Sequence, residues 1–154
     1  MTDRPHARAC IFMKERAEEA ARFYAATIPE SRVEHVAAAG EGTTIVLFTL
    51  LGSPFMAMDG NPDFQSRPDC SIAVPTQDQE ETDRIWAALS AGGTEGPCGW
   101  LSDRFGVHWQ ITPRALVDML SAEDRQAAGR AHAAMMGMKK IDIAAIEAAF
   151  GAPT

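Results

Sequence analysis

The chain has 154 residues, of which 46% are hydrophobic and 23% charged. These are ordinary values for a globular domain, and they argue against wholesale disorder. A chain of this length suits one domain, or two small halves that share a core. The formal net charge of −7 disfavours nucleic acid and anionic membrane as partners, because both bind clustered Lys and Arg.

The cysteines and the N-terminus indicate a compartment. Cys10, Cys70 and Cys98 are odd in number and show no Cys-x-x-Cys spacing, and the N-terminal residues lack the apolar core of a signal peptide. No apolar run approaches the roughly 18 residues that cross a bilayer. We therefore expect a reducing, cytoplasmic setting and no membrane segment.

The first half of the chain predicts the element order βαβββ. A short apolar run over residues 7–14 predicts a buried strand, and apolar residues at three- and four-residue spacings over 15–27 predict a helix. Turn residues at Gly40–Gly42 and Asp59–Pro62 then separate three further strands. Those strands are predicted over residues 33–39, 43–51 and 54–58.

The second half begins the same order again. Residues 70–75 predict a strand, and Thr76 with Gln79 fits a capping box that opens a helix reaching about residue 90. Sliding the chain over itself by 62 residues places Glu18, Glu19 and Arg22 of the first predicted helix on Glu80, Glu81 and Arg84 of the second. This coincidence indicates an internal duplication.

A strand, a turn and a second strand are predicted between Cys98 and Pro113. Asp103–Gly106 carries the turn signal, and the run that follows it alternates. One face holds Val107, Trp109 and Ile111, and the other holds His108, Gln110 and Thr112. Thr112 before Pro113 predicts a capped helix start.

The remainder predicts helices over residues 114–120, from a cap at Ser121 to about residue 136, and over 142–150. Met135, Met136 and Met138 lie close together in the sequence. Such a cluster is more often adaptable packing at a core or subunit contact than a cofactor site.

Four segments resemble the PhnB-like family, whose members are often labelled 3-demethylubiquinone-9 3-methyltransferase. They are Ala17–Tyr24, Phe55–Gly60, Cys98–Ile111 and Lys139–Ile143. The family belongs to the vicinal oxygen chelate superfamily of glyoxalase I, extradiol dioxygenases and bleomycin-resistance proteins. The resemblance implies an α+β fold of two tandem βαβββ units, about residues 7–60 and 68–113, which form U-shaped mixed sheets. A helical extension over 114–150 completes a single domain spanning 1–154, and a homodimer is expected.

In that fold each helix covers the outer face of its sheet, and the inner face meets a ligand. Strand parity then predicts which side chains lie on each face. The helix side would take Cys10, Phe12, Phe55, Ala57, Cys70, Ile72, Val74, Val107, Trp109 and Ile111. The cavity side would take Ala9, Ile11, Met56, Met58, Ser71, Ala73, His108, Gln110 and Thr112.

The resemblance also locates the four positions that bind a divalent ion in metal-dependent relatives. They fall on Ala9, Met56, Ser71 and Gln110. Divalent transition metals need imidazole, thiolate or carboxylate donors, which this set does not supply. A one-residue slip would bring in Cys10 or His108 without rebuilding the set. We expect no metal and no other cofactor.

Three hypotheses for function remain open. The first is a metal-free protein that binds a small apolar or aromatic molecule in a cavity lined by Met56, Met58, Ser71, Trp100, His108 and Gln110. Trp100 would be a flat wall for a ring, although a buried core tryptophan is equally ordinary. The second is a lyase, isomerase or oxygenase that uses His108 or Asp103 as acid or base. The third is a dimeric interaction module whose contact is formed by the C-terminal helices.

Each catalytic candidate has a structural alternative. Asp103 more often shapes its own turn through an Asx hydrogen bond, and His108 has no evident partner to orient it as a base. Methyl transfer, as the family label says, is disfavoured because no glycine-rich turn between a strand and a helix provides an S-adenosylmethionine site.

Overall fold

The computed structural model describes residues 7–39, 42–61, 63 and 70–153. The predicted turn at Gly40–Gly42 and the predicted boundary between residues 60 and 68 lie partly outside the described residues. The chain divides into two compact units, residues 1–67 and 68–154, which are taken separately below. Among the described helices, none is both long enough and apolar enough to span a membrane.

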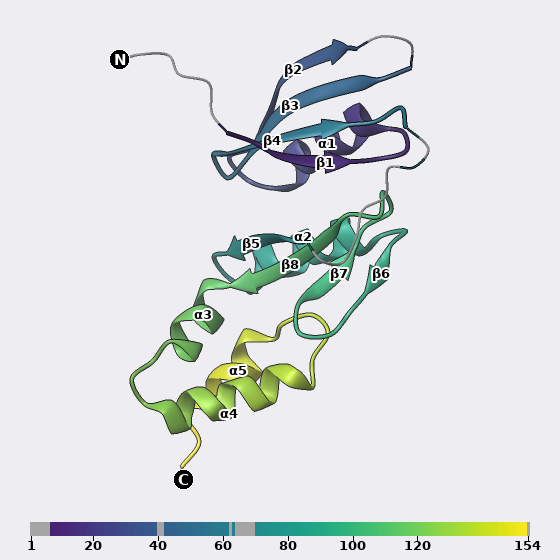
Figure 1. The fold of residues 1–154 in the computed structure, drawn as a ribbon. Helices are drawn as coiled ribbons and strands as arrows, with labels where there is room; N and C mark the ends of the chain where they lie inside the picture. The colour runs from purple at the N-terminus through teal and green to yellow at the C-terminus, as the bar shows by residue number, and fades with distance from the viewer. Residues whose placement is uncertain (1–6, 40–41, 62, 64–69, 154) are drawn as a thin grey trace, which may run out of the picture. The chain divides into compact units, whose positions relative to one another are not determined.

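The first unit is a four-stranded mixed sheet with one helix on one face (Figure 1). Its elements are β1 (Ala9–Phe12), α1 (Ala17–Thr27), β2 (Arg32–Ala38), β3 (Thr44–Leu50) and β4 (Ser53–Met58). The strand order is β1-β4-β3-β2, with β1 parallel to β4 and the other neighbours antiparallel. The core lies between α1 and the sheet, where the ring centroids of Tyr24 and Phe48 are 6.4 Å apart.

The start of α1 is stabilised from another part of the unit. Its N-cap residue, Arg16, has a left-handed φ of 68° and makes no side-chain cap hydrogen bond. The carboxylate of Asp59, which follows β4, instead accepts the backbone N–H of Ala17 at 2.8 Å and that of Thr44 at 3.0 Å. Asp59 is 7% exposed, so one buried side chain joins the helix to the sheet.

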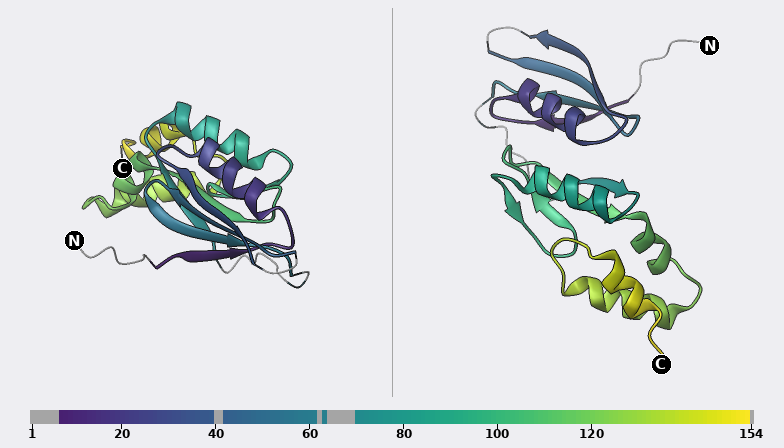
Figure 2. Two further views of the ribbon diagram at one scale, coloured as in Figure 1. Left: turned by 90° about the horizontal axis from the view of Figure 1, so that it is seen from above. Right: turned by 180° about the vertical axis from the view of Figure 1, so that it is seen from behind.

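The second unit repeats this arrangement and adds three helices, as the views in Figure 2 show. Its elements are β5 (Ile72–Thr76), α2 (Gln79–Ser90), β6 (Thr94–Glu95), β7 (Trp100–Ser102), β8 (His108–Pro113), α3 (Arg114–Leu120), α4 (Arg125–Met136) and α5 (Ile143–Phe150). The order β5-β8-β7-β6 matches that of the first sheet, and β5 is again parallel to its neighbour. The predicted fold class, two βαβββ units with a C-terminal helical tail, is confirmed.

The cap of α2 differs from the predicted one. Asp78 is the N-cap and its carboxylate accepts the N–H of Glu81, while the Glu81 carboxylate accepts the N–H of Gln77. The capping pair is therefore Asp78 with Glu81, with Glu81 bonded one residue before the N-cap, and the predicted capping box of Thr76 with Gln79 is wrong. Thr76 is fully buried and its hydroxyl lies 2.6 Å from that of Thr82, which ties the end of β5 to α2.

Two of the three C-terminal helix starts also differ from expectation. Pro113 is the N-cap of α3 and no side chain caps that helix, so Thr112 does not have its predicted role. Asp124, rather than Ser121, caps α4 by accepting the N–H groups of Gln126 and Ala127. Asp124 directly precedes α4 with a β-region backbone, so its carboxylate reaches two N–H groups of the first turn that have no partner within the helix. The three helices enclose a small apolar cluster of their own: Leu116, Met119, Ala131, Ile141 and Ile146.

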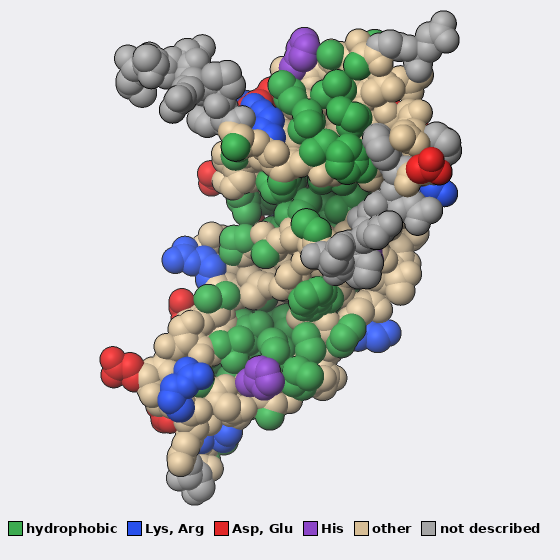
Figure 3. All heavy atoms as spheres, in the orientation of Figure 1, with side chains coloured by type: hydrophobic (Ala, Val, Ile, Leu, Met, Phe, Trp, Pro, Cys, Tyr) green, Lys and Arg blue, Asp and Glu red, His purple; other side chains and the backbone are tan. Residues whose placement is uncertain are grey.

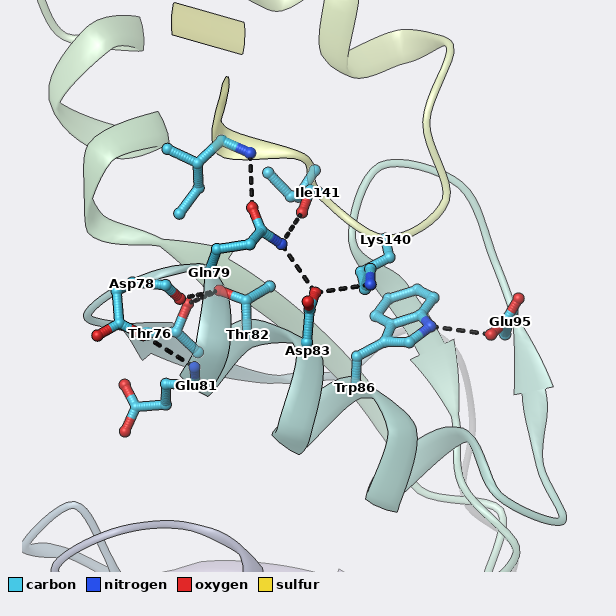
Figure 4. Close-up of polar contacts among 11 residues, drawn as sticks. Thr76, Asp78, Gln79, Glu81, Thr82, Asp83, Trp86, Glu95, Lys140 and Ile141 are labelled. Carbon is cyan, nitrogen blue, oxygen red and sulfur yellow. Dashed lines mark hydrogen bonds and ion pairs between the residues drawn. The ribbon is translucent and has the colours of Figure 1, made fainter. Parts of the chain in front are cut away.

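A polar network fastens the segment before α5 onto α2 (Figure 4). The Gln79 amide donates to the carbonyl of Ile141 at 3.0 Å and accepts the N–H of Ile143 at 2.8 Å. The same amide donates to Asp83, whose carboxylate lies 2.6 Å from the Lys140 ammonium. Hydrogen bonds from Lys140 and then from Gln79 lower the pKa of the Asp83 carboxyl.

Gln79→Ala is expected to lower the free energy of unfolding by about 1–2 kcal/mol, because two part-buried backbone groups lose their partner. Hydrogen exchange should rise in residues 141–146 while α1 stays unchanged. Gln126→Ala, on the exposed face of α4, is the control and should leave both measurements unaltered. Unchanged exchange in α5 would contradict this account.

Candidate functional site

The open face of the second sheet carries most of the predicted site residues. Along β8, Trp109 and Ile111 are fully buried, whereas His108, Gln110 and Thr112 are half-buried on the opposite face, as the alternation predicted. The register of β5 with β8 pairs Ile72 with Trp109 and Ala73 with Gln110. Because paired residues point to the same face of a sheet, Ala73 lies beside Gln110 on the open face.

Two rows of side chains cross this open face. In the first, Trp100 on β7 pairs with Gln110, and in the second, Ser102 pairs with His108. Gln110 Nε2 donates to Ser71 Oγ at 2.7 Å, which brings together two residues 39 positions apart. Trp100 is 43% exposed, in contrast to Trp86 at 5% and Trp109 at 0%. The face therefore presents an accessible indole next to a hydrogen-bonded amide and hydroxyl.

Asp103 has a structural role. It is 4% exposed, and its Oδ1 accepts the N–H groups of Phe105 at 2.8 Å and Val107 at 3.1 Å. Its Oδ2 accepts Nε1–H of Trp109 at 2.8 Å. The predicted Asx turn is thus confirmed, with an added bond to a core indole that sequence reasoning missed. These three bonds disfavour Asp103 as a proton carrier for a ligand.

The open face of the first sheet differs from prediction at β1. The register pairs Cys10 with Met56 and Phe12 with Met58, and therefore places Ala9 and Ile11 on the helix side with Phe55 and Ala57. Phe12 is 44% exposed, which agrees with this assignment and not with packing under α1. In Figure 3 hydrophobic side chains gather over the strands of this sheet. The predicted parity of β1 is wrong by one residue.

The start of β5 also needs one correction. Cys70 precedes the strand and is exposed, so it does not pack under α2 as predicted. Ile72 and Val74 keep their predicted side, since they pair with the buried Trp109 and Ile111. The strand begins two residues later than its apolar composition indicated.

Neither open face, taken by itself, carries a donor set that fits a divalent transition metal. With the corrected register, Cys10 replaces Ala9 beside Met56, and burial raises the pKa of the Cys10 thiol, which favours the protonated, non-ligating form. The Gln110 amide is already bonded to Ser71. Within the described ranges no group of three or more His, Cys, Asp or Glu side chains is placed to hold a metal ion. We derive no chemistry through such an ion.

A pocket that sequence reasoning missed lies within the second unit, beside the network of Figure 4. It has a volume of about 520 Å³, and its lining includes Gln79, Asp83, Lys140 and Asp142. The signal that could have located it is the segment Lys139–Ile143, one of the four that carry the family resemblance. Two of the carboxylates that line the pocket already have partners: Asp83 pairs with Lys140, and Asp142 accepts the N–H of Ala145.

Comparison with known families decides the assignment. Residues 5–112 match the family model described as 3-demethylubiquinone-9 3-methyltransferase. The chain belongs to this family. The matched segment of this 3-demethylubiquinone-9 3-methyltransferase family member ends within β8, so helices α3–α5 lie beyond it. Comparison with curated protein sequences found no match.

Solved structures support the same conclusion. A putative 3-demethylubiquinone-9 3-methyltransferase, the PhnB protein of Bacillus cereus, is 28% identical with a TM-score of 0.63, and the match covers 71% of this chain and 99% of that one. A protein from Pseudomonas aeruginosa is 19% identical with a TM-score of 0.60, covering 71% and 98%. The fosfomycin resistance protein FosX of Listeria monocytogenes is 16% identical with a TM-score of 0.56, covering 79% and 100%. The last two show the shared fold alone.

Proposed function

We propose that this protein binds a small apolar or aromatic molecule against the open face of its second sheet, without a divalent metal ion. The observation that carries the proposal is the 43% exposure of Trp100 beside the Gln110–Ser71 pair. Trp100 serves as a flat wall for a ring, and His108 lies on the same face one row away. Met56 and Met58 lie on the open face of the first sheet and are proposed as apolar ligand contacts of that unit, taken by itself.

The polar pair defines what kind of ligand this face accepts. Gln110 Nε2 carries two hydrogens, and one of them is donated to Ser71 Oγ. The amide oxygen and the second N–H are left for a ligand. An indole next to one amide suits a planar molecule that has a single polar substituent. A ligand with several charges would lose its hydration without finding compensating partners on this face.

Tryptophan fluorescence tests the proposal directly. Of the three tryptophans, Trp100 alone is exposed, so acrylamide quenching should report mainly on it. A panel of mono-substituted naphthalenes and quinolines should contain members that reduce this quenching and raise the melting temperature. Trp100→Ala should weaken their binding at least about tenfold, since ring stacking and apolar burial contribute about 1.4 kcal/mol or more.

Matched variants distinguish binding at this site from non-specific binding to exposed apolar side chains. Gln110→Ala should weaken only those ligands that carry the polar substituent. Val117→Ala removes another exposed apolar side chain, on α3, and should leave binding unchanged. Equal losses in Trp100→Ala and Val117→Ala, or a panel without a single binder, would reject the proposal.

Acid or base catalysis is the second candidate, and the structure favours His108 over Asp103 for it. His108 is half-buried on the same open face as Gln110, whereas Asp103 is committed to its turn. If a bound ligand is turned over, His108→Ala should abolish turnover and leave binding unchanged. We do not propose methyl transfer, because each sheet is a mixed four-stranded sheet and not the doubly wound parallel sheet of a conventional methyltransferase.

We further propose that the protein is a homodimer, as the family resemblance implies. Sedimentation equilibrium of the full chain should then give twice the mass of 16.6 kDa. A monomer mass at micromolar concentration would reject this part of the proposal while leaving ligand binding open.

A further inference from the structure

A cysteine and a methionine from distant parts of the second unit lie together at its surface. Cys98 Sγ lies 3.7 Å from Met136 Sδ, although the two residues are 38 positions apart. Cys98 precedes β7, and Met136 is the last residue of α4. The pair therefore joins the segment matched by the family model to the helical extension beyond it.

Backbone hydrogen bonds join the segment that contains Cys98 to the residues that follow α4. The N–H of Cys98 donates to the carbonyl of Met138 at 2.8 Å, and that of Gly99 donates to Lys139 at 2.7 Å. Cys98 has a left-handed φ of 57°, which a non-glycine residue adopts only when its surroundings hold it there. The main chain thus holds Cys98 next to the end of α4, and the side-chain rotamers then set the distance between the two sulfur atoms.

The three clustered methionines do not share one role. Met135 and Met138 pack against the apolar cluster of the C-terminal helices, as expected for adaptable packing. Met136 is 57% exposed and contributes little to that core. Its contact with Cys98 is a bond between a weak donor and a weak acceptor, so it adds little stability. Packing therefore accounts for two of the three methionines and leaves Met136 unexplained.

We propose that Cys98 and Met136 bind a soft monovalent cation, Cu(I). Thiolate and thioether ligands together select Cu(I) over the harder divalent ions. With metal–sulfur bonds of about 2.3 Å, a sulfur separation of 3.7 Å corresponds to a bent angle of roughly 110°, which leaves room for a third ligand. His132 is exposed and lies four residues before Met136, so the two residues share one side of α4, and the proposal assigns the imidazole of His132 as that third ligand.

The binding step is a simple exchange. The Cys98 thiol releases its proton to solvent, a sulfur–copper bond forms, and no atom changes oxidation state. The residues assigned to this site are not those proposed to bind the small molecule, so either proposal can fail without the other.

The test uses the full chain with Cys10→Ser and Cys70→Ser, which leaves Cys98 as its one cysteine. Cu(I) is titrated without oxygen against bicinchoninate, a chromophoric competitor. We expect one Cu(I) per chain, its loss in Cys98→Ser, and at least about tenfold weaker binding in Met136→Leu and in His132→Ala. Met135→Leu is the matched control and should bind as tightly as the parent.

A second measurement distinguishes the paired site from a bare thiol. Ag(I), a diamagnetic substitute that undergoes no redox change here, is added to protein labelled on its methionine methyl carbons. The resonance of Met136 should shift, and the other methionine resonances should stay in place. Parent-like affinity in Met136→Leu, or equal shifts across all methionines, would show binding by an ordinary surface thiol and overturn the proposal.

Discussion

Asp103→Ala is expected to lower the free energy of unfolding of the second unit by about 3–4 kcal/mol, because two buried donors and one part-buried donor lose the same carboxylate acceptor. Two of these donors are backbone N–H groups of the turn between β7 and β8, and the third is the indole of Trp109 in the core. All three tryptophans lie in this unit. Urea unfolding followed by tryptophan fluorescence therefore measures the loss directly.

A double-mutant cycle identifies the bond to Trp109. In Asp103→Asn the amide can keep its oxygen on the two backbone donors, but it then directs an NH₂ group at the indole N–H. Trp109→Phe removes that indole donor, so Asp103→Asn should cost about 1 kcal/mol less in the Trp109→Phe background. Trp109→Phe changes the tryptophan fluorescence, so unfolding of all four proteins in the cycle is measured by circular dichroism. Simple additivity would contradict the assigned contact.

Asp118→Ala provides the surface control for Asp103. Asp118 is exposed on α3, and its replacement should change stability by no more than about 0.5 kcal/mol. A loss below about 1 kcal/mol in Asp103→Ala would mean that the three bonds do not organise the hairpin. Asp103 would then become available again as a candidate acid or base.

Asp59→Ala is expected to destabilise the first unit by about 2–3 kcal/mol, because the N–H groups of Ala17 and Thr44 both lose their acceptor inside the protein. No local side chain can replace it, since Arg16 makes no cap hydrogen bond. Hydrogen exchange resolved by residue suits this measurement, because the first unit has no tryptophan. Amides in the first turn of α1 and at the start of β3 should lose protection together.

The cap of α2 offers a comparison for Asp59. Asp78 caps its own helix from the preceding position and is exposed, so Asp78→Ala should cost about 1 kcal/mol. Its effect on exchange should stay within the first turn of α2. If Asp59→Ala costs less than Asp78→Ala, or leaves β3 protected, Asp59 does not join the helix to the sheet.

The strand β8 and the strand β1 show where sequence patterns succeed and fail. In β8 polar and apolar residues alternate, so the pattern predicts a buried Trp109 and a Gln110 on the opposite face. The burial of the strand confirms both. In β1 the four residues Ala9–Phe12 are all apolar and carry no alternation. No residue pattern therefore fixes the parity of β1, and an error of one residue exchanges its two faces.

The sequence by itself determined the family, the duplication and the order of the elements except β6, because these follow from local periodicity, turn chemistry and motif spacing. The strand β6 has only two residues and carries no periodic pattern. It also indicated the Asx turn at Asp103, since that turn is built within five residues. The caps of α3 and α4 could not be assigned uniquely, because Thr112 and Ser121 offer hydroxyls that compete with nearby alternatives.

Only the tertiary structure decided the contacts between distant residues. The Asp59 cap on Ala17, the bond from Gln110 to Ser71 and the pairing of Cys98 with Met136 join residues 42, 39 and 38 positions apart. No periodic pattern relates such positions, since their approach depends on how strands pair and how the helices pack on them. Both proposals therefore depend on contacts that form only when the chain folds.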